Sequence, residues 1–258
     1  MIWDTLILNP MINALILIYD FLGNNFGIAI VVFTALIRAI TLPLTLQQQR
    51  STQRMQSMQQ SKRYLEIQKK FKGNRQKQQE ETLKLYKELG INPLSGCLPM
   101  LVQFPIIIGL YQAISRALAA TPFDLFELSR HLYPAVSPGL IPLHSQFLWM
   151  NLAQPERLYL PFLPAVGIPV LTILVVITTY LQTKLATPPS PDAQGAQMNR
   201  MMTLYMPFLL GWIAYTLSAG LALYFVASNV LAILQYAVLG KVNWRNLIPG
   251  RAATPTKP

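Results

Sequence analysis

The chain has 258 residues, of which 52% are hydrophobic and only 12% charged, with a formal net charge of +11. Its apolar residues gather in long uncharged runs, which excludes an ordinary soluble domain and predicts several helices that each cross a bilayer core of roughly 30 Å. The single cysteine excludes an intramolecular disulfide, and the sequence has no G-x-x-x-x-G-K-[ST] nucleotide-binding loop.

The first segment, residues 1–22, mixes apolar and polar side chains and has no basic residue before its apolar positions. This pattern argues against a cleaved secretory signal and predicts an amphipathic helix at the membrane surface. A sixth membrane span is the alternative that the composition leaves open.

The first core span is predicted at residues 23–46, and it contains one unusual charge. Arg38 is the only charged residue in residues 27–46, and the other long apolar runs contain no Asp or Glu that could pair with it. A lone arginine in a span costs roughly 2.5–3.5 kcal/mol on insertion scales. Arg38 therefore either extends toward the membrane edge or lines a hydrated cavity open to the cytoplasm. In the second case its partner comes from outside the chain, and Thr34 lies one turn earlier on the same face.

Residues 47–90 carry eleven of the 21 Lys and Arg residues, so the positive charge is concentrated in one loop. The turn sequence Lys72-Gly73-Asn74 separates two helical patterns and predicts a basic helical hairpin. The positive-inside rule places this hairpin in the cytoplasm, with the N-terminus outside and the C-terminus inside. The hairpin is either a solvated connector or a docking arm. The candidate docking residues are Met55, Met58, Lys62, Arg63, Lys69 and Lys70.

The fold class that this pattern predicts is an all-α polytopic membrane protein with a core of five transmembrane helices. The remaining spans are predicted at residues 91–117, 158–184, 201–218 and 219–240. The segments between and after them are an extracytoplasmic loop with short interfacial helices near residues 123–132 and 145–152 (residues 118–157), a cytoplasmic loop (residues 185–200) and a basic cytoplasmic tail (residues 241–258). Polar residues inside spans usually join helices, but together with Arg38 they predict a polar interior.

Two stretches carry a family resemblance: residues 90–106 (GINPLSGCLPMLVQFPI) with Gly109-Leu-Tyr-Gln112, and residues 219–229 (AGLALYFVASN) after Met206-Pro207. They resemble the YidC/Oxa-type membrane protein insertases, and the resemblance covers residues 26–239. It implies a five-helix core around a groove that is open to the cytoplasm and to lipid, in a short member without a large periplasmic domain. The groove residues implied by the resemblance, or added from the polar positions of the spans, are Arg38, Thr34, Gln103, Tyr224, Asn229 and Gln235.

The implied function is a membrane protein insertase and chaperone of a bacterial plasma membrane. Its expected partners are nascent membrane proteins and the lipid bilayer, with the ribosome and a Sec translocon as candidates. We expect a monomer with no catalytic residue, no metal or other cofactor and no sequence-specific nucleic-acid binding. A substrate's hydrophobic segment is expected to slide along the third and fifth spans. The alternatives are a small-solute transporter with an anion at Arg38 and a non-transporting assembly factor.

Overall fold

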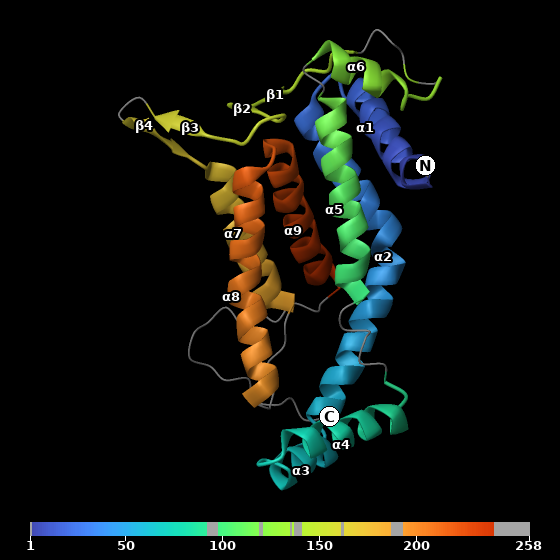
Figure 1. Cartoon of the computed structure of the whole chain (residues 1–258), viewed down its shortest axis with the longest axis vertical. Helices are drawn as coiled ribbons and strands as arrows, with labels where there is room; N and C mark the ends of the chain where they lie inside the picture. The colour runs from blue at the N-terminus through green and yellow to red at the C-terminus, as the bar shows by residue number, and fades with distance from the viewer. Residues whose placement is uncertain are drawn as a thin grey trace.

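The computed structural model describes residues 2–91, 98–118, 121–134, 136, 141–160, 163–186 and 193–239. Figure 1 shows a mainly helical molecule, which confirms the predicted all-α class, whereas the core of five transmembrane helices stays a prediction. The helices in chain order are η1 (Asp4–Leu8, π-helical), α1 (Asn9–Phe21), α2 (Phe26–Gln59), α3 (Lys62–Lys70), α4 (Arg75–Glu88), α5 (Leu98–Ala117), α6 (Pro122–Ser129), α7 (Val170–Ala186), α8 (Ala193–Thr216) and α9 (Ala219–Val238). The short strands are β1 (Gln146–Phe147), β2 (Met150–Asn151), β3 (Leu158–Leu160) and β4 (Leu163–Ile168).

Helix α2 is longer than predicted. It begins at a cap, where the Asn25 side chain accepts a hydrogen bond from the Ile28 amide at 3.0 Å. It then continues for 34 residues, about 51 Å, through Pro43. The helix continues past residue 46, the predicted end of the first span, because no turn-forming residue interrupts the pattern before Ser61, which caps α3. The membrane boundary at residue 46 stays a prediction. One helix therefore runs from the membrane core to the hairpin.

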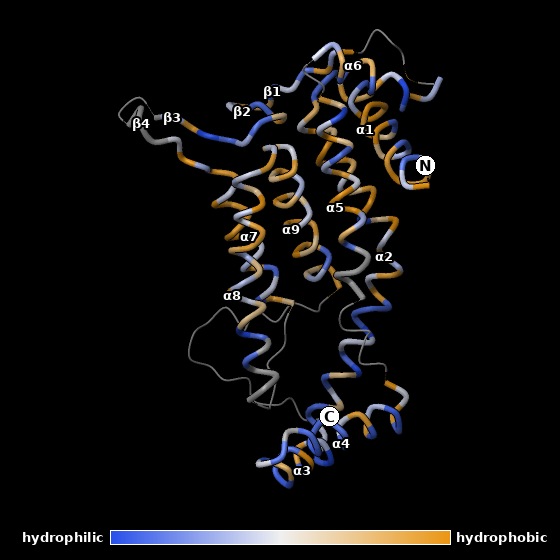
Figure 2. Tube along the Cα trace, in the orientation of Figure 1, coloured by the Kyte–Doolittle hydropathy of each residue, from blue (hydrophilic) through white to orange (hydrophobic). Residues whose placement is uncertain are grey.

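The helices α2, α5, α7, α8 and α9 form a bundle in which α7 packs against both α8 and α9, while α2 packs against α9 (Figure 1). Among the described residues, Asp4–Phe21, Phe26–Gln59 and Ala219–Val238 are long and apolar enough to cross a membrane, and α7 is a shorter apolar helix. Helix α9 begins at the predicted residue, whereas α8 begins earlier than expected. In Figure 2 the bundle is mostly hydrophobic and the α3–α4 hairpin is mostly hydrophilic.

The N-terminal helix packs into this bundle. Its side chains Leu8, Ile12, Leu15 and Ile16 are fully buried, and α1 contacts both α2 and α5. The Trp3 indole Nε1 also donates a hydrogen bond to the Gln112 Oε1 atom of α5 at 2.8 Å. Helix α1 thus joins α5 to α2, whereas its placement relative to the membrane surface stays a prediction.

The segment between α5 and α7 contains one confirmed and one wrong prediction. Helix α6 lies where a short helix was expected, and Thr121 and Asp124 form a capping box at its start. The helix expected near residues 145–152 is wrong, because β1 and β2 pair there as a tight antiparallel hairpin. Helix α7 begins at Val170, since prolines at 161, 164 and 169 are unsuited to a helix interior, and the membrane bounds of the third span, residues 158–184, stay a prediction.

The predicted basic hairpin is confirmed as helices α3 and α4, which lie at the opposite end of the molecule from α6 and the strands (Figure 1). Its small core consists of Met58, Tyr64 and Leu85, all of them buried. The Arg63 guanidinium and the Glu88 carboxylate form an ion pair of 3.0 Å between the two helices. The predicted tail, residues 241–258, and part of the loop at residues 185–200 lie outside the described residues.

Candidate functional site

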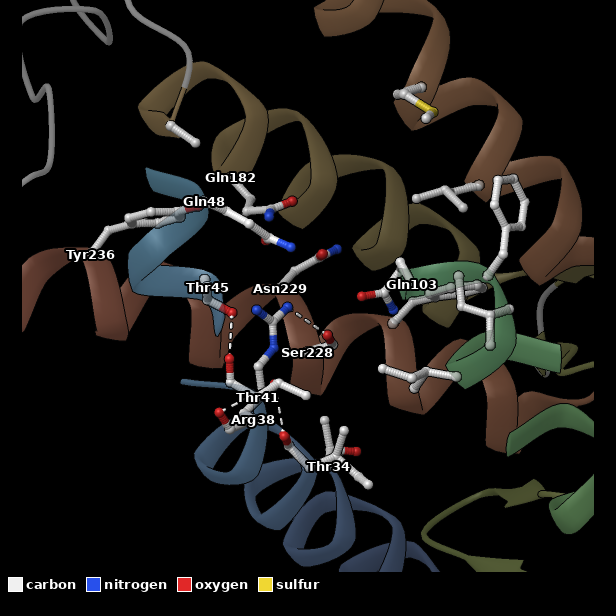
Figure 3. Close-up of a pocket in the computed structure, with 18 of the residues that line it drawn as sticks. Thr34, Arg38, Thr41, Thr45, Gln48, Gln103, Gln182, Ser228, Asn229 and Tyr236 are labelled. Atoms are coloured by element: carbon white, nitrogen blue, oxygen red, sulfur yellow. Dashed lines mark hydrogen bonds between the residues drawn. The ribbon is translucent and has the colours of Figure 1, made fainter. Parts of the chain in front are cut away.

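A cavity of about 510 Å³ lies inside the bundle, and its walls differ in polarity. Helix α2 supplies a polar wall that runs along one face of the helix: Thr34, Arg38, Thr41, Thr45, Gln48, Gln49, Thr52, Gln53 and Gln56. Helices α5 and α8 supply mainly apolar side chains: Phe104, Ile106, Ile107, Leu209, Leu210 and Ile213. Helix α9 contributes Ser228 and Asn229 between them, as Figure 3 shows.

Arg38 places its guanidinium inside this cavity (Figure 3). Its Nη2 atom donates a hydrogen bond to the Ser228 hydroxyl at 2.7 Å. Within the described part of the chain, ion pairs join Arg63 to Glu88, Lys84 to Glu81 and Arg130 to Glu127, and Arg38 is in none of them. A guanidinium has five N–H donors, so most of its hydrogen-bonding capacity remains for a ligand. The cavity therefore holds a positive charge whose hydrogen-bond partner on the protein is neutral.

The structure brings five of the six predicted groove residues to this cavity. Thr34 is only 1% exposed, and its hydroxyl donates to the Ile30 carbonyl at 2.6 Å. The Gln103 Nε2 atom donates to the Tyr224 hydroxyl at 2.8 Å, which joins α5 to α9. Asn229 lines the cavity as well, although its Nδ2 atom donates to the hydroxyls of two α7 residues, Thr178 and Thr179, at 3.1 and 2.8 Å.

The sixth residue, Gln235, does not line the cavity, and its Nε2 atom is buried without a hydrogen-bond partner in the described structure. Conversely, sequence reasoning missed the glutamines and threonines of α2 beyond Arg38. Their signal was present, since Thr41, Thr45, Gln48 and Thr52 recur every three or four residues. Thr41 and Thr45 were missed although they lie inside the predicted first span, and Gln48 and Thr52 were missed because residues from 47 onward were assigned to the hairpin.

The predicted docking residues of the hairpin divide into two groups. The basic side chains of Lys62, Arg63, Lys69 and Lys70 are exposed, and Met55 is half-buried. Met58 is only 3% exposed because it packs between α3 and α4. Met58 is therefore a core residue of the hairpin in this conformation, which corrects its expected role as an exposed docking side chain.

The cavity ends at an apolar layer on the side of α6 and the strands. Ile30, Ile114 and Leu152 are fully buried there, beside Gly220. A Cβ atom on Gly220 would lie 2.9 Å from Ile114 Cγ2 and 3.2 Å from the Leu152 carbonyl oxygen, so the glycine permits this close approach. Thr34 is the last polar residue of the α2 wall, about 12 Å along the helix from Phe26 at its start. The cavity is thus closed at this end by tightly packed hydrocarbon.

Together the apolar bundle, the basic hairpin and the arginine-containing cavity define a multi-pass helical membrane protein with an internal polar site. A family model described as 60Kd inner membrane protein matches residues 17–245. The chain belongs to this family, whose members that resemble it are bacterial membrane protein insertases of the YidC type rather than catalytic enzymes. It is accordingly a multi-pass protein of the bacterial inner membrane.

Individual relatives resemble the chain over most of its length. Membrane protein insertase YidC 2 of Bacillus anthracis is 34% identical over 244 residues, which cover 93% of this chain and 82% of that protein. Membrane protein insertase MisCA of Bacillus subtilis is 31% identical over 258 residues, covering 99% of this chain and 86% of that protein. An active YidC insertase solved by crystallography shares 27% identity with a TM-score of 0.49; the match covers 85% of this chain and 43% of that one.

Proposed function

We propose that this protein inserts nascent membrane proteins by receiving the polar flank of a hydrophobic segment in the cavity. The observation that carries the proposal is the Arg38 guanidinium, which lies inside the helical bundle and, among the described residues, donates a hydrogen bond only to the Ser228 hydroxyl. A buried cation of this kind is costly and is found mostly at functional sites. An acidic flank of a substrate would supply the missing countercharge.

The attraction between Arg38 and such a flank is strong enough to bind the flank and weak enough to let it leave. Two unit charges 4 Å apart attract by roughly 4 kcal/mol at an effective dielectric constant of about 20. The hydroxyl and amide groups of the α2 wall would hydrogen-bond the rest of the flank, from Gln56 inward to Thr34. The flank would then have only the apolar layer, about 12 Å deep along α2, left to cross.

The hydrophobic segment would leave sideways between α5 and α8. Phe104 of α5 and Leu209 of α8 both line the cavity and are 49% and 41% exposed, so their apolar surface continues outward toward lipid. This changes the route expected from the sequence, because the described lining from the third span, α7, consists of Gln182 and Ala186. Burial of apolar surface in lipid, at roughly 25 cal/mol per Å², would drive the step without nucleotide hydrolysis.

The direction of transfer follows from the charge of the hairpin. The exposed cations Lys62, Lys69 and Lys70 favour a cytoplasmic hairpin, hence an N-terminus outside and a C-terminus inside. In that orientation the polar wall of α2 opens toward the cytoplasm and the apolar layer faces outward. The same cations suit the negatively charged surface of a ribosome, and one chain contains a whole cavity, which favours a monomer with or without a Sec translocon.

The test is insertion into liposomes that contain the purified protein. A single-span substrate with an acidic N-terminal tail is added, and protection of that tail from external protease is measured for wild type, Arg38→Ala and Arg38→Lys. We expect Ala to lose most of the protected fraction and Lys to restore part of it. Arg50→Ala, an exposed cation on the same helix, is the matched control and should behave as wild type. Equal insertion by all variants would overturn the role of Arg38 and favour an assembly factor that works through packing.

A further inference from the structure

The segment at residues 145–157, here called the sealing loop, contacts four of the five core spans at the closed end of the cavity. The Phe147 ring packs on Gly27 of α2, where a Cβ atom would collide with it. The carbonyl oxygens of Gln154 and Leu152 accept hydrogen bonds from the Ala219 and Gly220 amides at 2.8 and 3.0 Å. These amides belong to the first turn of α9, which has no carbonyl of its own to offer them.

The loop also reaches α7 and α8. The Glu156 Oε2 atom accepts a hydrogen bond from the Leu171 amide in the first turn of α7 at 3.0 Å. The guanidinium of the adjacent Arg157 lies over the Tyr215 ring of α8, 5.1 Å from its centroid. A carboxylate at the start of a helix satisfies an otherwise unpaired amide and interacts favourably with the helix dipole.

Glu156 is unusual because its carboxylate is buried. The residue is only 7% exposed, and it is in none of the three ion pairs named above for the described residues. Its second oxygen, Oε1, accepts a hydrogen bond from the Trp149 indole Nε1 at 2.9 Å. Burying a carboxylate without compensation is expensive. Here each oxygen accepts one N–H, so the carboxylate fits a site with two donors and no spare acceptor.

The Trp149–Glu156 hydrogen bond closes the sealing loop on itself. Within the sealing loop the Leu152 amide also donates to the Ser145 carbonyl at 2.8 Å, and the Ala153 amide donates to the Asn151 side chain at 3.0 Å. Leu152 is thereby held in the apolar layer above Thr34, against Gly220 of α9. The loop supplies the part of the layer that no span supplies.

We propose that Glu156 is a positioning residue for insertion, whose carboxylate fixes the sealing loop to α7 and so keeps Leu152 as the outer seal of the cavity. The seal blocks water and ions while the other end stays open to a substrate. The proposal rests on the cavity being the insertion route, but the seal itself can be measured with no substrate present.

The experiment measures proton entry into protein-containing liposomes that carry an entrapped pH-sensitive dye, after the external pH is lowered. Glu156→Gln replaces one acceptor oxygen by an NH₂ group, which then faces an N–H donor. Trp149→Phe removes that donor and leaves the carboxylate in place. The double variant should recover part of the loss, because the remaining glutamine oxygen can still accept from the Leu171 amide.

We expect proton entry to rise severalfold for Glu156→Gln, to rise less for Trp149→Phe and to fall back in the double variant. Glu127→Gln is the matched control, because it makes the same carboxylate-to-amide change at a more exposed glutamate on α6. Its proton entry should equal that of wild type. If no variant leaks more than wild type while thermal stability falls, Glu156 only stabilises the fold and the proposal is overturned. If Glu156→Gln does not fold, a Trp149→Phe variant with proton entry equal to that of wild type also overturns the proposal. Failure of the Arg38 test alone would instead overturn the insertion route, since proton entry needs no substrate.

Discussion

The two ends of the cavity differ in the atoms that line them and in how tightly those atoms pack. Toward the hairpin, α2 presents amides and hydroxyls, and both polar atoms of the Gln49 side chain are buried without a partner in the described structure. Toward the sealing loop, Ile30, Ile114 and Leu152 are fully buried around a glycine. The polar groups at the hairpin end can thus form and break hydrogen bonds with a ligand, whereas the tightly packed side chains at the other end favour a single conformation. The proposed insertion route would use both properties, because the cavity would admit a polar chain without opening a leak.

The largest expected effect comes from reversing the charge at the polar end. Arg38→Glu should lower the protease-protected fraction of an acidic-tailed substrate by at least about tenfold, since an attraction worth several kcal/mol becomes a repulsion. A substrate with a basic tail should keep or gain insertion in the same assay. Arg50→Glu is the control, and equal behaviour of both tails in Arg38→Glu would contradict a charge-reading cavity.

At the packed end, a larger side chain at Gly220 should destabilise the fold. Gly220→Val would bring side-chain atoms against Ile114 and the Leu152 carbonyl, which predicts a loss of about 1–3 kcal/mol in the free energy of unfolding. Thermal unfolding of the detergent-purified protein measures it. Gly73→Val serves as the control because no atom lies within 4 Å of its Cβ position. Equal melting temperatures for the two variants would show that the side chains around Gly220 can shift at little cost to make room for valine.

A substitution at the polar end should cost much less. Tyr224→Phe removes the acceptor of the Gln103 amide, and because polar groups or water in the cavity can replace it, we expect a loss of about 1 kcal/mol or less. Melting temperature and insertion are both measured. A loss as large as that of Gly220→Val would mean that the two ends are equally rigid, and the contrast would fail.

The smallest effect concerns the region where α1 meets α6. His131 Nδ1 lies 2.7 Å from Asn9 Oδ1, and its Nε2 lies 2.7 Å from the Arg116 guanidinium, which can only donate. Burial and then the Arg116 charge lower the pKa of His131, against smaller opposing contributions from Asp4 and Glu127. The unfolded chain therefore binds the proton first, so stability is complete above about pH 6.5 and is lost as the pH falls through the lower folded pKa. Melting temperatures between about pH 7 and 5 should fall for wild type and stay flatter for His131→Gln.

Much of the bundle could be predicted because a membrane-spanning helix is visible in the sequence as a long apolar run without charges. Helix α9 begins at the predicted residue, since small residues follow Ser218 and no charge interrupts them. Arg38 was predictable for a related reason, because one charge among apolar residues needs an explanation wherever it lies. These inferences depend on neighbours in the sequence and not on distant contacts.

The rest depended on contacts that sequence spacing does not give. The segment near residues 145–152 looked helical from its apolar side chains, but its backbone pairs across a tight turn at Leu148 and Trp149. Glu156 resembled an ordinary loop acid, because its partners lie seven residues before it and fifteen residues after it. Gln235 was assigned to the cavity from its polarity and its place in the family resemblance, but it does not line the cavity in the structure.

Helix α2 joins Arg38 and the hairpin in one continuous rod, and Pro43 lies between them. Proline cannot supply the amide that would bond the carbonyl one turn earlier, so the rod has a single weak joint just beyond the arginine. The sixteen residues that follow Pro43, up to Gln59, form an arm of about 24 Å, and a rotation of about 10° at the joint would move its tip by roughly 4 Å. A substrate that binds the hairpin would therefore bend α2 at Pro43 and widen the open end of the cavity. Arg38 would stay in place, because it lies on the side of Pro43 that packs toward the sealing loop.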